Sequence, residues 1–143
     1  MATITRSADA VWNGSGKDGR GTVTTQSRTL SETAYSAKMR FGDEKGTNPE
    51  ELIAAAHAGC FAMALAFGLS AAGHEPEELR TSARLRMEQE GGGWRIATIQ
   101  LQLRGRVPGL SRDEFLKFAE DAKANCPVSK VLNAEISLDA DLA

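Results

Sequence analysis

The N-terminal part of the chain has the pattern of short strands separated by turns. Residues 2–12 mix β-branched and small side chains, and residues 21–25 have the composition of a second strand. The sequence NGSG at residues 13–16 is typical of a loop between them. Residues 35–41 are expected to form a third strand, followed by a polar, glycine-containing segment.

A long helix is predicted next. Asn48 stands directly before a proline, the favoured order for an N-cap and a first helical residue, and Glu51 fits the third position of a capping box. A cap at Thr47 satisfies the same rule shifted by one residue, so both caps remain open. The helix is expected to end at Ala72, because Gly73 suits the left-handed position that follows many helices.

This helix is apolar on all sides, since only His57 and Ser70 are clearly polar between Leu52 and Ala72. About 20 apolar residues suffice to cross a bilayer. This run, however, is rich in Ala and Gly and has no Lys or Arg at its ends, so we expect no membrane span. At about 37 Å the helix is too long for one small domain to cover on every side. Burial between two copies of the chain solves this problem, and we expect a homodimer.

Two alternating runs in the second half predict a β-hairpin. Leu85 and Met87 alternate with charged residues, and three consecutive glycines follow them. Ile99, Leu101 and Leu103 then alternate with polar residues. Both strands are expected to keep one polar face in water.

Two helices and a last strand complete the predicted fold. Ser111 with Glu114 has the spacing of a capping box and begins a helix, while Cys126 precedes a proline and opens a shorter one. Residues 136–142 alternate as a final strand. The fold class is therefore α+β: an antiparallel sheet with a long buried central helix, in a single domain over residues 1–143.

Composition and charge limit the kinds of partner. The net charge of −2 gives no reason to expect nucleic acid or an anionic membrane surface. No basic segment followed by an apolar run opens the chain, so we expect no secretory signal and a cytoplasmic location. In that compartment two cysteines favour free thiols, a catalytic pair or metal ligands over a permanent structural disulfide.

The two cysteines, Cys60 and Cys126, differ in their local surroundings. Cys60 lies within the apolar helix, where burial raises the pKa of a thiol and favours simple core packing. Cys126 stands at the start of a helix, where the helix dipole favours the thiolate. Local chemistry alone therefore selects Cys126 as the nucleophile.

His57 precedes Cys60 by three residues, so both lie on nearby parts of one helical face. Such a pair is compatible with a nucleophile and its base, or with two metal ligands. A zinc site needs more ligands than this sequence offers at the usual spacings, and we expect no metal. We favour a third interpretation, in which His57 is a buried histidine bound to a backbone carbonyl.

Charged residues near the start of the helix are candidates for activating a thiol. Glu50 and Glu51 lie in the first turn, where acidic side chains stabilise the helix dipole. If Glu51 serves the cap, Glu50 is free for another role, and it lies about 80° around the helix from Cys60. Arg40 would have to fold back from the preceding segment to reach the thiol.

Two motifs together resemble the osmotically inducible protein C family. The first is RFGDEKGTNPEEL at residues 40–52, continued by AAHAGCF at residues 55–61. The second is NCPVSKVL at residues 125–132. The resemblance extends to the region around Trp12, to Pro108 and Gly109, and to the last strand, so it covers essentially the whole chain.

The resemblance implies an intertwined homodimer with the cysteine helices at its centre. It also implies a peroxidase that reduces organic or lipid hydroperoxides in the response to oxidative or osmotic stress, related to the organic hydroperoxide resistance proteins. In that pattern Cys60 is the peroxidatic cysteine, Cys126 resolves its sulfenic acid as a disulfide, and Arg40 and Glu50 form the activating pair. No bound cofactor is implied; an external dithiol, of the dihydrolipoyl type, is the expected reductant.

Two other functions remain compatible with the sequence. One is a non-catalytic redox sensor or binding protein in which the same cysteines form a regulatory disulfide. The other is a structural dimer with two incidental cysteines. Turnover separates them from a peroxidase, because a sensor stops after one equivalent of hydroperoxide.

Overall fold

The chain forms two compact units, each with its own three-stranded sheet. A computed structural model describes residues 2–143. The first unit extends to Leu52 and the second is Ile53–Ala143. The boundary lies near the start of α2 (Pro49–Ala71), the longest helix of the described chain.

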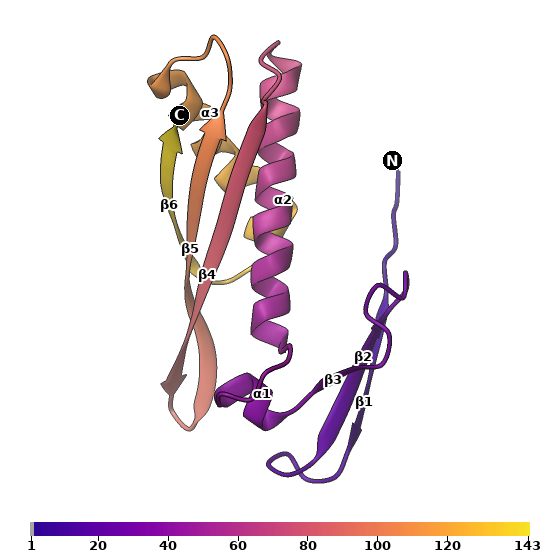
Figure 1. Ribbon diagram of the computed structural model, residues 1–143. Helices are drawn as coiled ribbons and strands as arrows, with labels where there is room; N and C mark the ends of the chain where they lie inside the picture. The colour runs from indigo at the N-terminus through magenta and orange to yellow at the C-terminus, as the bar shows by residue number, and fades with distance from the viewer. Residues whose placement is uncertain (1) are drawn as a thin grey trace. The chain divides into compact units, whose positions relative to one another are not determined.

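The first unit contains an antiparallel sheet in the order β1-β2-β3 (Figure 1). The rings of Trp12 and Tyr35 meet across this sheet with their centroids 5.4 Å apart. Between them lies Gly21, where an added Cβ would come within 2.5 Å of both rings. A glycine is therefore needed for the two aromatic rings to close over the strand. The three strands are β1 (Ala8–Asn13), β2 (Arg20–Thr25) and β3 (Thr33–Tyr35).

The third strand is shorter than the sequence pattern suggests. Residues 35–41 were expected to be extended, but the strand stops at Tyr35 and α1 (Ala37–Phe41) follows. The side chain of Ser36 accepts a hydrogen bond from the backbone N–H of Met39 at 3.2 Å, which caps this helix. The strand prediction is wrong there because a local serine cap outweighs the strand propensity of its neighbours.

Helix α2 begins and ends as its capping residues predict. The Asn48 side chain accepts from the Glu51 N–H at 2.8 Å, which decides between the two possible caps. At the other end Gly73 has a φ of +87°, and its N–H and that of His74 bind carbonyls of the last turn. This is the Schellman arrangement, which requires the left-handed conformation that glycine adopts freely.

The second unit has a hairpin and a parallel third strand. Strands β4 (Glu78–Glu90) and β5 (Gly93–Arg106) pair antiparallel around a turn in which Gly91 and Gly92 both have positive φ. Strand β6 (Glu135–Leu142) lies parallel to β5, so the expectation of an antiparallel sheet is wrong for this strand. The connection between β5 and β6 carries two helices, long enough for the crossover that parallel pairing requires.

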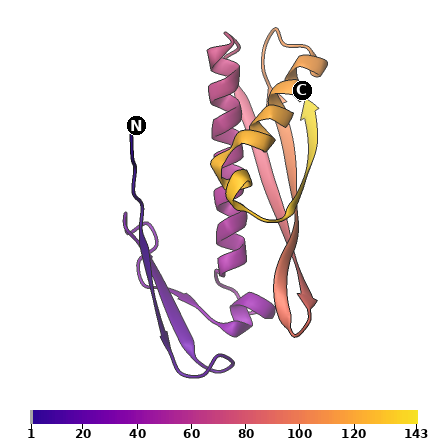
Figure 2. The same cartoon turned by 180° about the vertical axis from the view of Figure 1, so that it is seen from behind.

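Both larger helices of this unit cover the same face of its sheet (Figures 1 and 2). The two helices of the crossover are α3 (Arg112–Asn125) and α4 (Pro127–Val131). The predicted Ser111 cap is present on α3, with its Oγ accepting from the Glu114 N–H at 3.2 Å. The core fills the space between the helices and the sheet with buried side chains from α2, β5 and α3: Phe61, Leu65, Leu69, Ile99, Leu101, Leu103, Phe115, Ala119 and Ala122.

Only one side of α2 is buried within a single chain, although its sequence is apolar throughout. On the other side Met63 is 63% exposed and Phe67 is 71% exposed. A single chain therefore does not cover this helix on every side, as its length predicts, and its burial by a second copy of the chain stays a prediction. By length and composition α2 alone among the described helices is able to cross a membrane, yet its buried side belongs to the core of the second unit.

Gly105 provides a test of this packing. A Cβ at Gly105 would approach Cζ of the buried Phe115 ring to 2.4 Å and Cδ2 of Leu79 to 3.3 Å. We expect Gly105→Ala to destabilise the fold by about 1–3 kcal/mol, the usual cost of overpacking a core. Urea unfolding at a fixed protein concentration measures this as a lower midpoint. Gly16→Ala is the control, because nothing lies within 4 Å of its added Cβ, and equal midpoints for the two variants would contradict the packing described.

Candidate active site

Cys126 joins two helices and is completely buried. It ends α3 and caps α4, with φ −60° and ψ 131° between them. Its sulfur accepts hydrogen bonds from the backbone N–H of Ser129 at 3.4 Å and from the Ser129 hydroxyl at 3.5 Å. The extended backbone at Cys126 is what turns this sulfur back toward the first turn of α4.

Cys60 lies on α2 and remains partly exposed. Next to it on the helix, the Ala58 carbonyl accepts a hydrogen bond from the Thr81 hydroxyl of β4 at 2.9 Å, which ties this turn of α2 to the sheet. The backbone N–H of Val128 in α4 hydrogen-bonds to the sulfur of Cys60. The thiol is thus bordered by α4 while keeping access to solvent.

The Cys60 and Cys126 thiols are free and lie close enough for each to shift the pKa of the other. Burial raises the pKa of Cys60, and the neighbouring Cys126 raises it further. Burial also acts to raise the pKa of Cys126, but hydrogen bonds from Ser129, Cys60 and Val128 outweigh it and lower the pKa overall. Within the second unit, a single negative charge therefore rests more favourably on Cys126 than on Cys60.

His57 is a fully buried neighbour of this pair. Its Nε2 lies 2.7 Å from the hydroxyl oxygen of Ser129, and its Nδ1 has no hydrogen-bond partner among the described residues. Burial lowers the pKa of His57, which favours the neutral ring. The interpretation of His57 as bound to a backbone carbonyl is thus wrong, because its partner is a serine hydroxyl from a distant helix.

Ser129 is the residue of this site that the sequence did not single out. Its backbone N–H is three residues after Cys126, the spacing at which an N-cap side chain accepts from its helix. That spacing was visible in the sequence, whereas the contact of its hydroxyl with His57 joins residues 72 positions apart. Only the folded chain brings them together.

Arg40 and Glu50 form a close ion pair within the first unit. Nη2 of Arg40 lies 2.6 Å from Oε1 of Glu50, and its Nε lies 3.0 Å from both carboxylate oxygens. This hydrogen bonding to Glu50 raises the pKa of Arg40, whose cation also lies 5.0 Å from the centre of the Phe41 ring. Glu51 instead donates its N–H to the helix cap, so Glu50 is the acidic partner of the arginine.

The four candidate residues therefore form two pairs. Cys60 meets Cys126 in the second unit, and Arg40 meets Glu50 in the first. One pair supplies two sulfurs able to exchange electrons by forming a bond between them. The other supplies a fixed cation with a planar fork of donors, the kind of group that stabilises negative charge on sulfur or oxygen.

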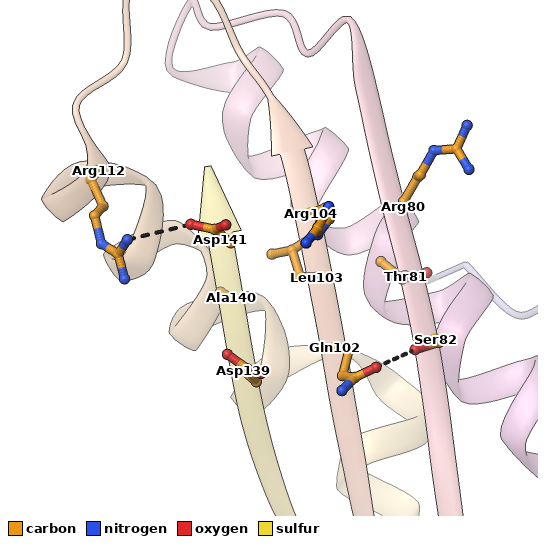
Figure 3. A pocket seen from close by; sticks show the side chains of 10 residues that line it. All are labelled: Arg80, Thr81, Ser82, Gln102, Leu103, Arg104, Arg112, Asp139, Ala140 and Asp141. Atoms are coloured by element: carbon orange, nitrogen blue, oxygen red, sulfur yellow. Dashed lines mark hydrogen bonds and ion pairs between the residues drawn. The ribbon is translucent and has the colours of Figure 1, made fainter. Parts of the chain in front are cut away.

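A hollow of about 450 Å³ lies on the outer face of the second sheet, away from the cysteines (Figure 3). Arg112 of α3 reaches Asp141 of β6 at 3.3 Å across one edge of it, and Ser82 binds Gln102 at 3.3 Å within it. Neither thiol lines it. Its open, polar lining is that of a solvated sheet surface, and the sulfur chemistry lies on the opposite side of the strands.

Metal chemistry finds no support in the described residues. From residue 2 to the C-terminus no group of three or more His, Cys, Asp or Glu side chains is arranged to hold a metal ion. His57 hydrogen-bonds to Ser129, which in turn hydrogen-bonds to Cys126. The arrangement is that of a thiol pair with a hydrogen-bonded polar neighbour.

Comparison with known proteins identifies the family of the chain. The family described as OsmC-like protein matches residues 42–141. The chain belongs to this family. It is 46% identical over 140 residues to Peroxiredoxin OsmC of Escherichia coli, a match that covers 98% of each protein. The family membership expected from the two cysteine motifs is confirmed.

More distant relatives carry a second name. Organic hydroperoxide resistance protein-like 1 of Staphylococcus saprophyticus is 36% identical over 104 residues, covering 70% of this chain and 71% of that protein. The crystal structure of an organic hydroperoxide resistance protein from Elizabethkingia anophelis is 27% identical and covers all of both chains, with a TM-score of 0.74. The α+β fold with two sheets and one long helix is therefore that of known OsmC and organic hydroperoxide resistance structures.

Proposed function

We propose that the protein is a thiol-dependent peroxidase that reduces organic hydroperoxides to alcohols. The observation that carries the proposal is that two free thiols lie close enough to shift each other's pKa, one of them partly exposed and the other fully buried. The names of the relatives support it, since they are a peroxiredoxin and organic hydroperoxide resistance proteins. A role in the response to oxidative or osmotic stress, in the cytoplasm, follows from the same resemblance.

In the proposed first step, Cys60 attacks the hydroperoxide. Its thiolate bonds to the outer peroxide oxygen, the O–O bond breaks, and the departing alkoxide takes a proton to become an alcohol. Cys60 is oxidised to sulfenic acid. Its partial exposure within one chain supports this order, because Cys126 is fully buried by its own chain and Cys60 is not.

The pKa of Cys60 requires an activating group, since burial raises it within the second unit. We assign this role to Arg40, whose cation would favour the thiolate and stabilise the negative oxygen that leaves. Glu50 would hold the guanidinium in one orientation. The bidentate ion pair supports this assignment, because the Glu50 side chain is only 12% exposed and leaves Arg40 few alternative positions.

In the proposed second step, Cys126 resolves the oxidised cysteine. Its sulfur bonds to the sulfur of Cys60, the S–O bond breaks, and water is released as the disulfide forms. An external dithiol, of the dihydrolipoyl type, would then reduce the disulfide by exchange. The reaction needs no bound cofactor, since the two sulfurs carry all the electrons exchanged.

We also propose that the protein acts as a homodimer. The exposed apolar side of α2, with Met63 and Phe67, supports this because a second copy of the same helix would cover it. In an intertwined dimer the cysteine helices of both subunits would lie at the centre.

A redox sensor is the alternative, and turnover separates the two functions. With dithiol present we expect the protein to consume many equivalents of an organic hydroperoxide such as cumene hydroperoxide. Cys60→Ser should abolish this consumption. Cys126→Ser should react once and leave Cys60 as sulfenic acid, detected by mass spectrometry after trapping with dimedone. Consumption that stops at one equivalent in the wild type would favour the sensor, and first-step reactivity retained in Cys60→Ser would assign the nucleophile to Cys126.

Arg40→Lys tests the activating pair. A lysine keeps the charge but loses the planar fork that binds Glu50 with two donors, so we expect kcat/KM for the hydroperoxide to fall by about 100-fold. Arg80→Lys is the matched control, because Arg80 is an exposed arginine paired with Glu78 on the outer face of the second sheet. Equal activity of the two variants would remove Arg40 from the mechanism.

Sedimentation velocity tests the dimer. The wild type should sediment as a dimer, and Phe67→Glu should shift it toward a monomer because a charge would be buried in the interface. Ser82→Glu, on the exposed outer face of β4, is the control and should leave the dimer intact. A monomeric wild type would contradict the proposal.

A further inference from the structure

A continuous row of hydrogen-bonding groups leads from α2 to the sulfur of Cys126. His57 Nε2 lies 2.7 Å from Ser129 Oγ, and that hydroxyl lies 3.5 Å from Cys126 Sγ. The backbone N–H of Ser129 approaches the same sulfur at 3.4 Å. The proposed mechanism assigns no role to His57 or Ser129, yet both are arranged around its second thiol.

The direction of these hydrogen bonds follows from counting donors. A serine hydroxyl has one hydrogen, and if Ser129 donates it to Cys126, His57 must donate its own Nε2 hydrogen to Ser129. His57 Nδ1 is then a lone-pair acceptor without a partner, which is less costly to bury than an unpaired N–H donor. The opposite direction would leave an N–H buried and unpaired at Nδ1. The neutral ring with hydrogen on Nε2 is therefore favoured.

Every group in this row then donates toward Cys126. The ring donates to the hydroxyl, the hydroxyl donates to the sulfur, and the backbone N–H donates to the same sulfur. Donors aimed at a sulfur stabilise its thiolate over its thiol. A hydroxyl that itself receives a hydrogen bond is a stronger donor, so His57 reinforces the bond from Ser129.

We propose that Ser129, reinforced by His57, is a positioning residue for the resolving step: it holds the sulfur of Cys126 as a thiolate directed at Cys60. The inference rests on the proposed function and concerns its second step, in which Cys126 resolves the oxidised Cys60. Arg40 and Ser129 then serve different sulfurs at different times. Before oxidation, Arg40 would draw the single negative charge to Cys60; after oxidation, Ser129 holds it on Cys126.

The chemistry of the second step explains why the Cys126 thiolate needs hydrogen-bond donors. Once Cys60 carries a sulfenic acid it is neutral, and Cys126 must supply the electron pair. The Cys126 thiol gives its proton to solvent, and the thiolate forms an S–S bond as the S–O bond of Cys60 breaks. Hydroxide leaves and takes a proton from solvent to become water. Cys126 is fully buried, so without its donors the thiolate would be disfavoured at this moment.

Among the groups around Cys126, Ser129 is the main hydrogen-bonding partner that a substitution can alter. On α2 the titratable groups facing it are Cys60 and, through Ser129, His57, whose burial favours the neutral ring. On α3, Lys123 is paired with Glu120 at 3.2 Å, and on α4 Lys130 is exposed. Burial acts to raise the pKa of this thiol, and hydrogen bonds from Ser129, Cys60 and Val128 outweigh it and lower the pKa.

Single-turnover kinetics test the inference. Reduced protein is mixed with one equivalent of cumene hydroperoxide without dithiol, and quenched samples are analysed by mass spectrometry for trapped sulfenic acid and for disulfide. We expect Ser129→Ala to form sulfenic acid as the wild type does but to convert it to disulfide about 10-fold more slowly at pH 7, the effect of one unit in pKa. The pH midpoint of that conversion should move upward by a similar amount.

Conservative variants separate hydrogen bonding from simple packing. Ser129→Thr retains the hydroxyl and should restore most of the rate. His57→Gln can still donate to Ser129 but cannot titrate, so it should resolve faster than His57→Leu. Disulfide formation by Ser129→Ala at the wild-type rate, with an unchanged pH midpoint, would overturn the inference while leaving the peroxidase proposal intact.

A direct titration keeps the inference testable if the peroxidase proposal fails. In Cys60→Ser protein, Cys126 is the only thiol, and its ionisation is followed by thiolate absorbance near 240 nm. Adding Ser129→Ala should raise the midpoint, whereas adding Ser129→Thr should leave it nearly unchanged. An identical midpoint with alanine would show that Ser129 does not support the thiolate. Absence of sulfenic acid in the wild type would count against the proposed function alone.

Discussion

The packing of one side of α2 against the second sheet is the constraint on which the site depends. Phe61, Leu65 and Leu69 fix the rotation of the helix, because all three are buried in the same core. That rotation places His57 inside and leaves Cys60 at the border between core and solvent. A helix turned by one residue would expose the histidine or bury the thiol. The apolar contacts of α2 therefore determine that His57 is buried within the chain and that Cys60, the proposed nucleophile, is not.

Most elements were predictable from the sequence because their signals are local. Caps at Asn48 and Ser111 mark the starts of α2 and α3, and alternation marks β4, β5 and β6. The sequence pattern fails at two elements. Residues 35–41 have the pattern of a strand, but the cap at Ser36 begins α1 there, and β6 pairs parallel where an antiparallel strand is predicted. Alternation shows which side of a strand is buried but carries no information on strand direction, which depends on the connection.

The candidate site was predictable only in part, for a different physical reason. Local chemistry favours a thiolate at Cys126, and the hydrogen bonds there agree, while the role of Cys60 as nucleophile came from resemblance to a family. The Arg40–Glu50 contact required the chain to turn between α1 and α2. The Ser129–His57 contact required α4 to fold against α2. The spacing of these residues along the sequence predicts neither contact, because each contact depends on the tertiary structure.

Cys126 ends α3 and caps α4, so a chemical change at its sulfur also changes the cap of α4. A sulfur in a disulfide carries no negative charge and is a weaker acceptor than a thiolate. The first turn of α4 would thus lose much of its cap when the proposed disulfide forms, and this helix has only five residues to compensate. Local opening of α4 would be easier in the disulfide state than in the state before it, in which Cys60 is a sulfenic acid and Cys126 a thiolate. The disulfide would then be less well shielded than that thiolate, which would favour its attack by a reducing dithiol.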